Sequence, residues 1–113
     1  MREIKAIIQP FMLEPVLHAL AAIDDLPGIS VSQVMGWGQS KPTDSAHTVV
    51  EAGHAFVPMT KLEIVVPAEV ALRVVDTVIN AARTGRPGDG KVFVSDVLRV
   101  IRIRSGDEDE AAL

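Results

Sequence analysis

The order of apolar patterns most constrains how this chain of 113 residues can fold, because a strand–helix–strand succession occurs twice. In the first half, residues 2–9 have a strand pattern, a helix pattern follows from Glu14 to Ile23, and Ile29 to Met35 alternates like a strand. The second half repeats the order, with elements predicted at Lys61–Val66, 68–82, Lys91–Ser95 and Leu98–Arg104. This succession predicts an α+β fold, the ferredoxin-like βαββαβ sandwich.

The composition fits one folded domain over residues 1–113, because 48% of the residues are hydrophobic. The chain has no cysteine, which excludes disulfides, zinc–thiolate sites and cysteine nucleophiles. Its net charge of −4 argues against general binding to nucleic acid, which requires a basic surface. No apolar run is long enough to cross a bilayer and no signal-peptide pattern opens the chain, so we expect a cytoplasmic protein.

Glycines, a proline and a lysine are concentrated between the second helix pattern and the next strand pattern, from Thr84 to Val94. Glycines can bring the backbone close to an anion and turn N–H groups toward it. Lys91 adds an ammonium group beside them, as phosphate-binding loops commonly do. The alternative is that Gly88-Asp89-Gly90 is a tight turn before a strand. The loop therefore predicts either a phosphate site or a turn.

Arginines and apolar residues are interspersed from Arg99 to Arg104. If this run is a strand, Arg102 and Arg104 lie on one face, roughly 6.5–7 Å apart along the strand. Two guanidinium groups at that spacing can bind adjacent phosphates, so a nucleotide polyphosphate is the first functional prediction. The alternative is that the arginines form the solvated face of an edge strand.

A long polar segment from Gly36 to Thr60 has no clear period. Loops of this length in a compact domain are usually functional or disordered. Glycine, serine, threonine and scattered charge predict a mobile arm that folds on contact with a partner. An inert excursion from the sheet is the alternative.

These patterns resemble the P-II signal-transduction family over essentially the whole chain. The matching stretches are residues 4–11 (IKAIIQPF), 34–38 (VMGWG), 61–66 (KLEIVV), 81–94 (AARTGRPGDGKVFV) and 100–106 (VIRIRSG). In the family they correspond to the first strand and turn, the entry to the T-loop, the third strand, the B-loop and the C-loop. The resemblance implies one P-II-like domain over residues 1–113, with the T-loop at 36–60, the B-loop at 83–91, and the C-loop and tail at 102–113.

The resemblance also implies a function. Family members are homotrimers that bind ATP or ADP in clefts between subunits, many of them with Mg and 2-oxoglutarate, and they control a partner protein through the T-loop. Carried over residue by residue, the nucleotide-binding positions are Ser30, Gly36, Gly38, Gln39, Ser40, Val65, Gly88, Asp89, Gly90, Lys91, Arg102 and Arg104. Within this set, Gly88 to Lys91 and the two arginines would surround the phosphates, and Ser30 and Val65 would lie near the adenine. We therefore expect a regulator and not an enzyme, with a slow ATPase as the enzymatic alternative.

Three positions depart from the family pattern. Ser40 replaces a glutamine that helps to hold magnesium and 2-oxoglutarate, and Met59 replaces a lysine that pairs with a 2-oxoglutarate carboxylate. Ala52 replaces the tyrosine that some members use for uridylylation, and the chain has no tyrosine. We expect a divergent branch that has lost the 2-oxoglutarate response and tyrosine uridylylation. Its protein target is unknown, and a membrane transporter is one candidate.

Two histidines and a glutamate, His47, Glu51 and His54, lie within the polar segment. This spacing can bind a transition metal such as Zn, Ni or Cu, above all if several subunits contribute. The alternative is that all three are solvated residues of a mobile arm. A trimeric metal-binding regulator associated with a transport or efflux system is therefore the alternative function.

Overall fold

The computed structural model describes the backbone of residues 1–38, 49–51 and 54–113, and the side chains of residues 1–38 and 56–113. In chain order, the strands, α-helices and 3-10 helices (η) are β1 (Arg2–Ile8), η1 (Pro10–Met12), α1 (Leu13–Leu20), β2 (Ser30–Gly38), β3 (Val49–Glu51), β4 (His54–Val66), α2 (Ala68–Ala82), β5 (Gly90–Asp96) and η2 (Asp109–Ala112). The short β3 interrupts an order that is otherwise strand–helix–strand twice, as the sequence predicts.

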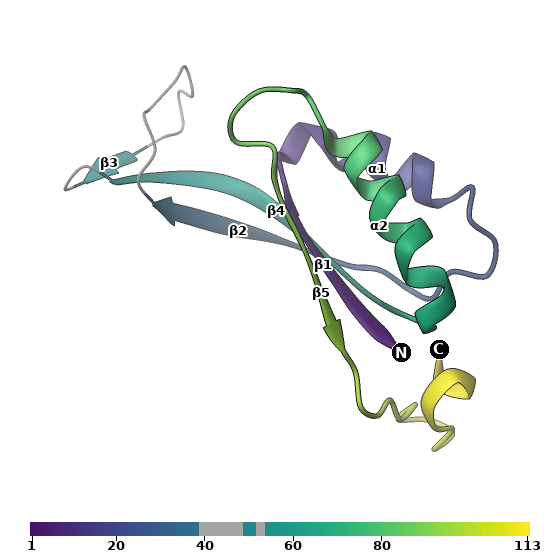
Figure 1. The fold of residues 1–113 in the computed structure, drawn as a ribbon. Helices are drawn as coiled ribbons and strands as arrows, with labels where there is room; N and C mark the ends of the chain where they lie inside the picture. The colour runs from purple at the N-terminus through teal and green to yellow at the C-terminus, as the bar shows by residue number, and fades with distance from the viewer. Residues whose placement is uncertain (39–48, 52–53) are drawn as a thin grey trace.

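The sheet forms one layer of the molecule, and α1 and α2 together form the other (Figure 1). The strand order is β2-β4-β1-β5, each neighbouring pair is antiparallel, and β3 pairs with β4. The first strands of the two halves, β1 and β4, therefore lie in the middle, and their partners lie at the edges. This arrangement confirms the predicted α+β ferredoxin-like sandwich.

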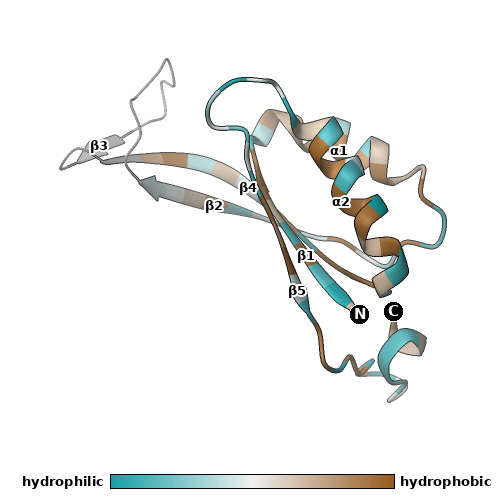
Figure 2. Ribbon diagram, in the orientation of Figure 1, coloured by the Kyte–Doolittle hydropathy of each residue, from teal (hydrophilic) through white to brown (hydrophobic). Residues whose placement is uncertain are grey.

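The core lies between the sheet and the two helices. On β1, Ile4, Ala6 and Ile8 are buried and the residues between them are only partly buried, because alternate side chains point to opposite faces. Val16 of α1 and Val74 of α2 have no exposed surface. The apolar sides of both helices turn toward the sheet in Figure 2. The opposite face of the sheet, here called the open face, carries the other set of side chains.

The helix boundaries agree with the sequence prediction for α2 and differ for α1. The helix α1 ends at Leu20 and not at Ile23. A turn continues the chain, with the Ile23 N–H donating to the Leu20 carbonyl at 3.0 Å, and Ile23 remains buried. The apolar period therefore identified a core residue correctly but overestimated the helix length. Neither of the α-helices in the described ranges is long and apolar enough to cross a membrane.

Two strand predictions need correction. The segment Gly36–Thr60 was predicted without regular structure, but β2 continues to Gly38 and β4 begins at His54, so both ends belong to a long antiparallel pair. This pair extends beyond the helices in Figure 1. The strand predicted at Leu98–Arg104 is wrong, because in this stretch only Ile101 forms a β-bridge, to Glu108, and residues 103–105 form a turn.

Candidate functional site

Asp89 organises the glycine-rich loop between α2 and β5. Its carboxylate accepts hydrogen bonds from the Thr84 N–H at 2.8 Å, from the Gly85 N–H at 3.0 Å and from the Thr84 hydroxyl. Gln9 adds a longer contact, Nε2 to Oδ1, at 3.5 Å. The Thr84 hydroxyl bond is the largest cause that lowers the pKa of Asp89 below its usual value of 3.8. The ionised carboxylate thus closes the loop on itself.

Glycine is required at several points of this loop. Gly85, Gly88 and Gly90 have φ angles of 84°, 94° and 103°, which other residues rarely adopt. At Gly90 space also forbids a side chain, because an added Cβ would lie 1.7 Å from the Ile7 carbonyl oxygen. The loop therefore has a special backbone shape, as both the phosphate-site and the tight-turn interpretations require.

Lys91 lies on the open face at the start of β5. The register pairs it with Ile7 of β1, which in turn pairs with Lys61 of β4. The Lys91 side chain is exposed and has no ion pair among the described residues, whereas the Lys61 Nζ lies 3.4 Å from Glu63 Oε1. An unpaired ammonium beside the glycine loop can bind an anion.

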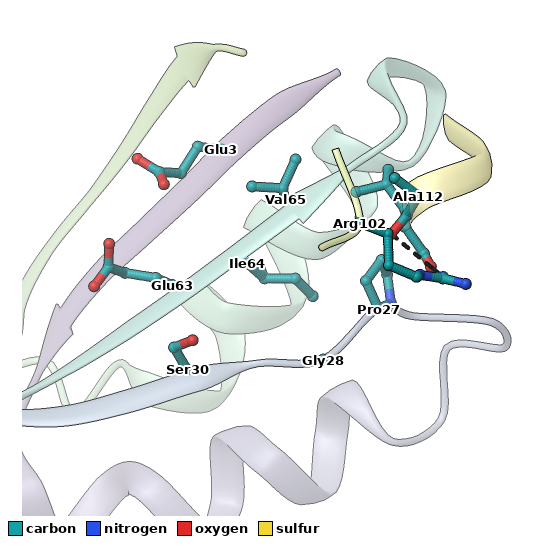
Figure 3. Close-up of a pocket in the computed structure, with 10 residues that line it drawn as sticks. Glu3, Pro27, Gly28, Ser30, Glu63, Ile64, Val65, Arg102 and Ala112 are labelled. Atoms are coloured by element: carbon teal, nitrogen blue, oxygen red, sulfur yellow. Dashed lines mark hydrogen bonds between the residues drawn. The ribbon is translucent and has the colours of Figure 1, made fainter. Parts of the chain in front are cut away.

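A cavity of about 490 Å³ lies at the other end of the sheet. Three of the predicted nucleotide-binding residues line it, namely Ser30, Val65 and Arg102 (Figure 3). The lining also includes two carboxylates that the sequence analysis does not predict, those of Glu3 and Glu63. The register could have indicated both, because Glu3 pairs with Val65 and Glu63 pairs with Ser30.

Arg102 extends into this cavity from an irregular segment. Its Nη2 donates to the carbonyl oxygens of Ala112 and Leu113, each at 3.3 Å, and its Nη1 lies 3.7 Å from Asp107 Oδ2. Arg104 lies in the following turn, so the predicted spacing of two arginines on one strand face is wrong.

The predicted site residues divide into two groups at opposite ends of β5. Gly88 to Lys91 lie at its start, beside the end of β1, whereas Arg102 lies beyond its end and lines the cavity with Glu3 near the start of β1. The glycines near the end of β2 lie at the same end of the sheet as the first group. Gly90 is level with Ile8 of β1 and Thr60 of β4, and Gly36 pairs with Val57, which lies further toward that end. One chain therefore holds the predicted site residues in two separate groups and does not bring Lys91 and Arg102 together.

The remaining predicted residues lie in or beside the undescribed parts of the chain. Gln39, Ser40 and His47 are outside the described residues. Glu51 and His54 pair across β3 and β4, but their side chains are not described. Among the residues that the structure describes, there is no group of three His, Asp or Glu side chains able to hold a metal ion.

Comparison with known proteins shows which family the chain resembles. The family model "Nitrogen regulatory protein P-II" matches residues 1–107. Nitrogen regulatory protein P-II 1 of Escherichia coli K12 is 47% identical over 113 residues, and P-II of Klebsiella oxytoca is 46% identical, each match covering both chains completely. A crystal structure of Arabidopsis thaliana PII bound to citrate is 38% identical, has a TM-score of 0.80, and is matched over 99% of this chain and 91% of that one.

These comparisons bear on two of the predictions. Proteins of this family are signal transducers without enzymatic activity, which confirms the prediction of a regulator. The prediction of a divergent branch has no clear support, because the identity to the E. coli protein extends over the full length. The fold and the full-length similarity lead to one conclusion: the chain belongs to the nitrogen regulatory protein P-II family.

Proposed function

We propose that this protein is a homotrimeric P-II regulator that binds ATP or ADP, with Mg, in clefts between subunits. It acts in the cytoplasm and controls a target protein through the segment 36–60, the family's T-loop. The observation that carries the proposal is the separation of Lys91 and Arg102 along β5. In this proposal each of the two groups is one half of a site, and a second chain supplies the other half.

The glycine loop supports phosphate binding from one subunit. Its glycines leave the backbone free of side chains, and the exposed Lys91 supplies a positive charge. Asp89 has a different role in this proposal. Its carboxylate is occupied by Thr84 and Gly85, so it shapes the loop and does not contact phosphate itself.

The cavity supports binding of the rest of the nucleotide from the neighbouring subunit. Ser30 and Val65 would lie near the adenine, and Arg102 would reach the phosphates held by the other chain. Charge-assisted bonds from a guanidinium group to phosphate are among the stronger hydrogen bonds in proteins. Arg104, exposed in the adjacent turn, is the second candidate for this contact.

Exposed apolar residues support assembly. Leu98 is 89% exposed and Ile103 is fully exposed, and Phe93, Val94 and Ile101 are about half exposed along the same segment. Large apolar side chains that are exposed close together in one segment favour an interaction site there. In the proposed trimer these side chains are buried between subunits.

A second part of the proposal concerns regulation. Met59 lies on β4 opposite Val34, with its Cγ 3.7 Å from the position of a Cβ on Gly36. A thioether there cannot pair with the carboxylate of 2-oxoglutarate. Together with Ser40 and the absence of tyrosine, this supports loss of the 2-oxoglutarate response and of tyrosine uridylylation.

Mixed trimers test the proposal. Lys91→Ala and Arg102→Ala should each weaken ATP binding by about 1.5–3 kcal/mol, the usual range for charge-assisted hydrogen bonds. Arg73→Ala, on the exposed side of α2, is the control and should bind normally. When the two variants are unfolded together and refolded, some clefts contain an intact Lys91 from one chain and an intact Arg102 from the other.

Isothermal titration of the mixture should therefore recover a fraction of sites with normal affinity. If Lys91 and Arg102 act within one chain, every site of the mixture remains weak, and the intersubunit site is wrong. If neither variant changes the affinity, both residues lie outside the nucleotide site.

A further inference from the structure

Residues 99–113 turn back on themselves beside the cavity. The Arg102 N–H donates to the Asp107 carbonyl at 2.9 Å, and the Gly106 N–H donates to the Arg102 carbonyl at 2.8 Å. A bridge between Ile101 and Glu108 continues this pairing. The turn depends on Gly106, whose φ is 76°. We refer to residues 107–113, which follow the turn, as the return segment.

The two arms of this turn carry opposite charges. Arginines precede the turn and acidic residues follow it, so the pairing places the carboxylates beside the guanidinium groups. The Arg99 Nη2 lies 2.7 Å from Glu108 Oε1, and the Arg102 Nη1 lies 3.7 Å from Asp107 Oδ2. Both pairs are partly exposed, so solvent screens them.

The return segment also occupies the hydrogen-bonding groups of Arg102. Nη2 is shared between the backbone oxygens of Ala112 and Leu113. Figure 3 shows Arg102 beside Ala112. Ala112 and Leu113 also line the cavity that contains Ser30 and Val65. The guanidinium group assigned above to phosphate is therefore engaged by the protein's own chain.

We propose that the return segment is an internal competitor that nucleotide must displace from Arg102. This inference rests on the proposed function, since it concerns the same site. Displacement is favourable because two backbone oxygens share one nitrogen at 3.3 Å each, and Asp107 lies beyond good hydrogen-bonding distance. A phosphate offers charged oxygens that a guanidinium group binds in a bidentate manner. The segment thereby lowers the apparent affinity of the site, because part of the binding free energy releases Arg102.

Two variants and one control test this competitor. A chain that ends at Asp109 removes both carbonyls, while the Asp109 N–H retains its bond of 2.7 Å to the Val100 carbonyl. Asp107→Asn removes the carboxylate beside Arg102 without shortening the chain. Glu110→Gln is the control. It removes one negative charge from the same segment, and the Glu110 side chain makes no hydrogen bond or ion pair among the described residues.

Isothermal titration with ATP and with ADP gives the readout, after light scattering shows that the variants and the wild type have one oligomeric state. The shortened chain should bind about threefold to tenfold more tightly, the equivalent of one ordinary hydrogen bond, and Asp107→Asn should shift the affinity in the same direction. Glu110→Gln should bind like the wild type. Equal or weaker binding by both test variants overturns the proposal, and so does equal tightening by Glu110→Gln, which would indicate a general charge effect.

The two proposals fail in different ways. If the wild type and all variants give no heat with either nucleotide, the nucleotide site itself is wrong. If the wild type binds and the two test variants match it, only the competitor is wrong. If the shortened chain does not assemble, the comparison of Asp107→Asn with Glu110→Gln decides.

Discussion

Gly90 lies against the backbone of Ile7 so closely that a Cβ on Gly90 would be 1.7 Å from the Ile7 carbonyl oxygen. In the register Gly90 pairs with Ile8, and its close contact with Ile7 joins the start of the edge strand β5 to the central strand β1. Because the obstacle is backbone, no rotation of a side chain can relieve it.

Gly90→Ala should therefore destabilise the protein. The φ of 103° alone costs a non-glycine residue about 1–3 kcal/mol, and the contact with Ile7 adds to it. Urea unfolding should show a lower midpoint with an unchanged slope. Gly28→Ala is the matched control, because nothing lies within 4 Å of its Cβ and its φ is not positive, and it should change stability by less than about 0.5 kcal/mol. Equal midpoints for the two variants would contradict the close contact.

Asp89 should give the protein a stability that depends on pH. Hydrogen bonds from Thr84 and Gly85 lower its pKa in the folded protein. The ionised carboxylate therefore contributes stability above its unfolded pKa, and this contribution is lost as the pH falls through the lower folded value. The wild type should be more stable than Asp89→Asn at neutral pH, and the difference should shrink below about pH 4.

Melting temperatures of both proteins between neutral and acidic pH measure this difference. Asp76→Asn is the control, since Asp76 is exposed on α2 and its side chain makes no described hydrogen bond. A difference between the wild type and Asp89→Asn that stays constant over the whole range would show that the charge of Asp89 is not what closes the loop.

Replacement of Ser40 and Met59 should restore a 2-oxoglutarate response. The wild type saturated with Mg-ATP should give no saturable heat with 2-oxoglutarate, whereas Ser40→Gln combined with Met59→Lys should bind it. An ammonium–carboxylate bond contributes about 1.5–3 kcal/mol, which is about tenfold to 150-fold in affinity. Tight binding by the wild type would contradict this prediction. Lys61→Ala would then show whether Lys61, two residues along the same strand face, has taken over the role.

Leu98→Asp should weaken the trimer. Burial of a leucine side chain stabilises an interface by about 1.5–3 kcal/mol, and a carboxylate at that position must also lose its water. Light scattering over a dilution series should show dissociation at higher concentrations than for the wild type. Leu72→Asp, at a leucine that is 71% exposed on the helical side, should assemble normally. A monomeric wild type at micromolar concentration with nucleotide present would exclude the trimer itself.

The two-layer fold could be predicted because the apolar residues of each helix and strand recur at the spacing typical of that element. In α2, the buried residues Ala71, Val74, Val78 and Ala82 are three or four positions apart, and the helix occupies the predicted range. The end of α1 was predicted less well, because Ile23 continues the apolar period although a turn, and not a helix, brings it into the core. The apolar period reflects which side chains are buried. The end of a helix depends on backbone hydrogen bonds, about which the period gives no information.

The segment after β5 could not be predicted from its own pattern. Ile101 and Ile103 alternate with arginines as in a strand, but a strand also needs a hydrogen-bonded neighbour. Within the described chain that neighbour is reduced to the bridge from Ile101 to Glu108, and Ile103 is fully exposed. We propose that another subunit buries the surface to which the alternating residues Ile101 and Ile103 belong.

The candidate site was predictable in its residue types and less so in its arrangement. The glycine loop and Lys91 form a local cluster that is visible in the sequence. Glu3 and Glu63 are 60 positions apart and line one cavity only because β1 and β4 pair in a particular register. The position of Arg102 depends on a turn that places the acidic return segment beside it. The sequence analysis did not identify this segment as a partner of Arg102.

In the proposed trimer, the separation of Lys91 and Arg102 along β5 also couples ligand binding to the association of the subunits. A ligand that needs both groups binds the assembled protein and not its free subunits, so its binding free energy adds to that of association. At 100 times its Kd, a nucleotide adds about 2.7 kcal/mol for each cleft that it occupies. The coupling is reciprocal, so dilution that separates the subunits also releases the nucleotide. The apparent affinity for nucleotide would therefore rise with the concentration of the protein itself, and a larger nucleotide supply would leave a smaller fraction of the subunits dissociated.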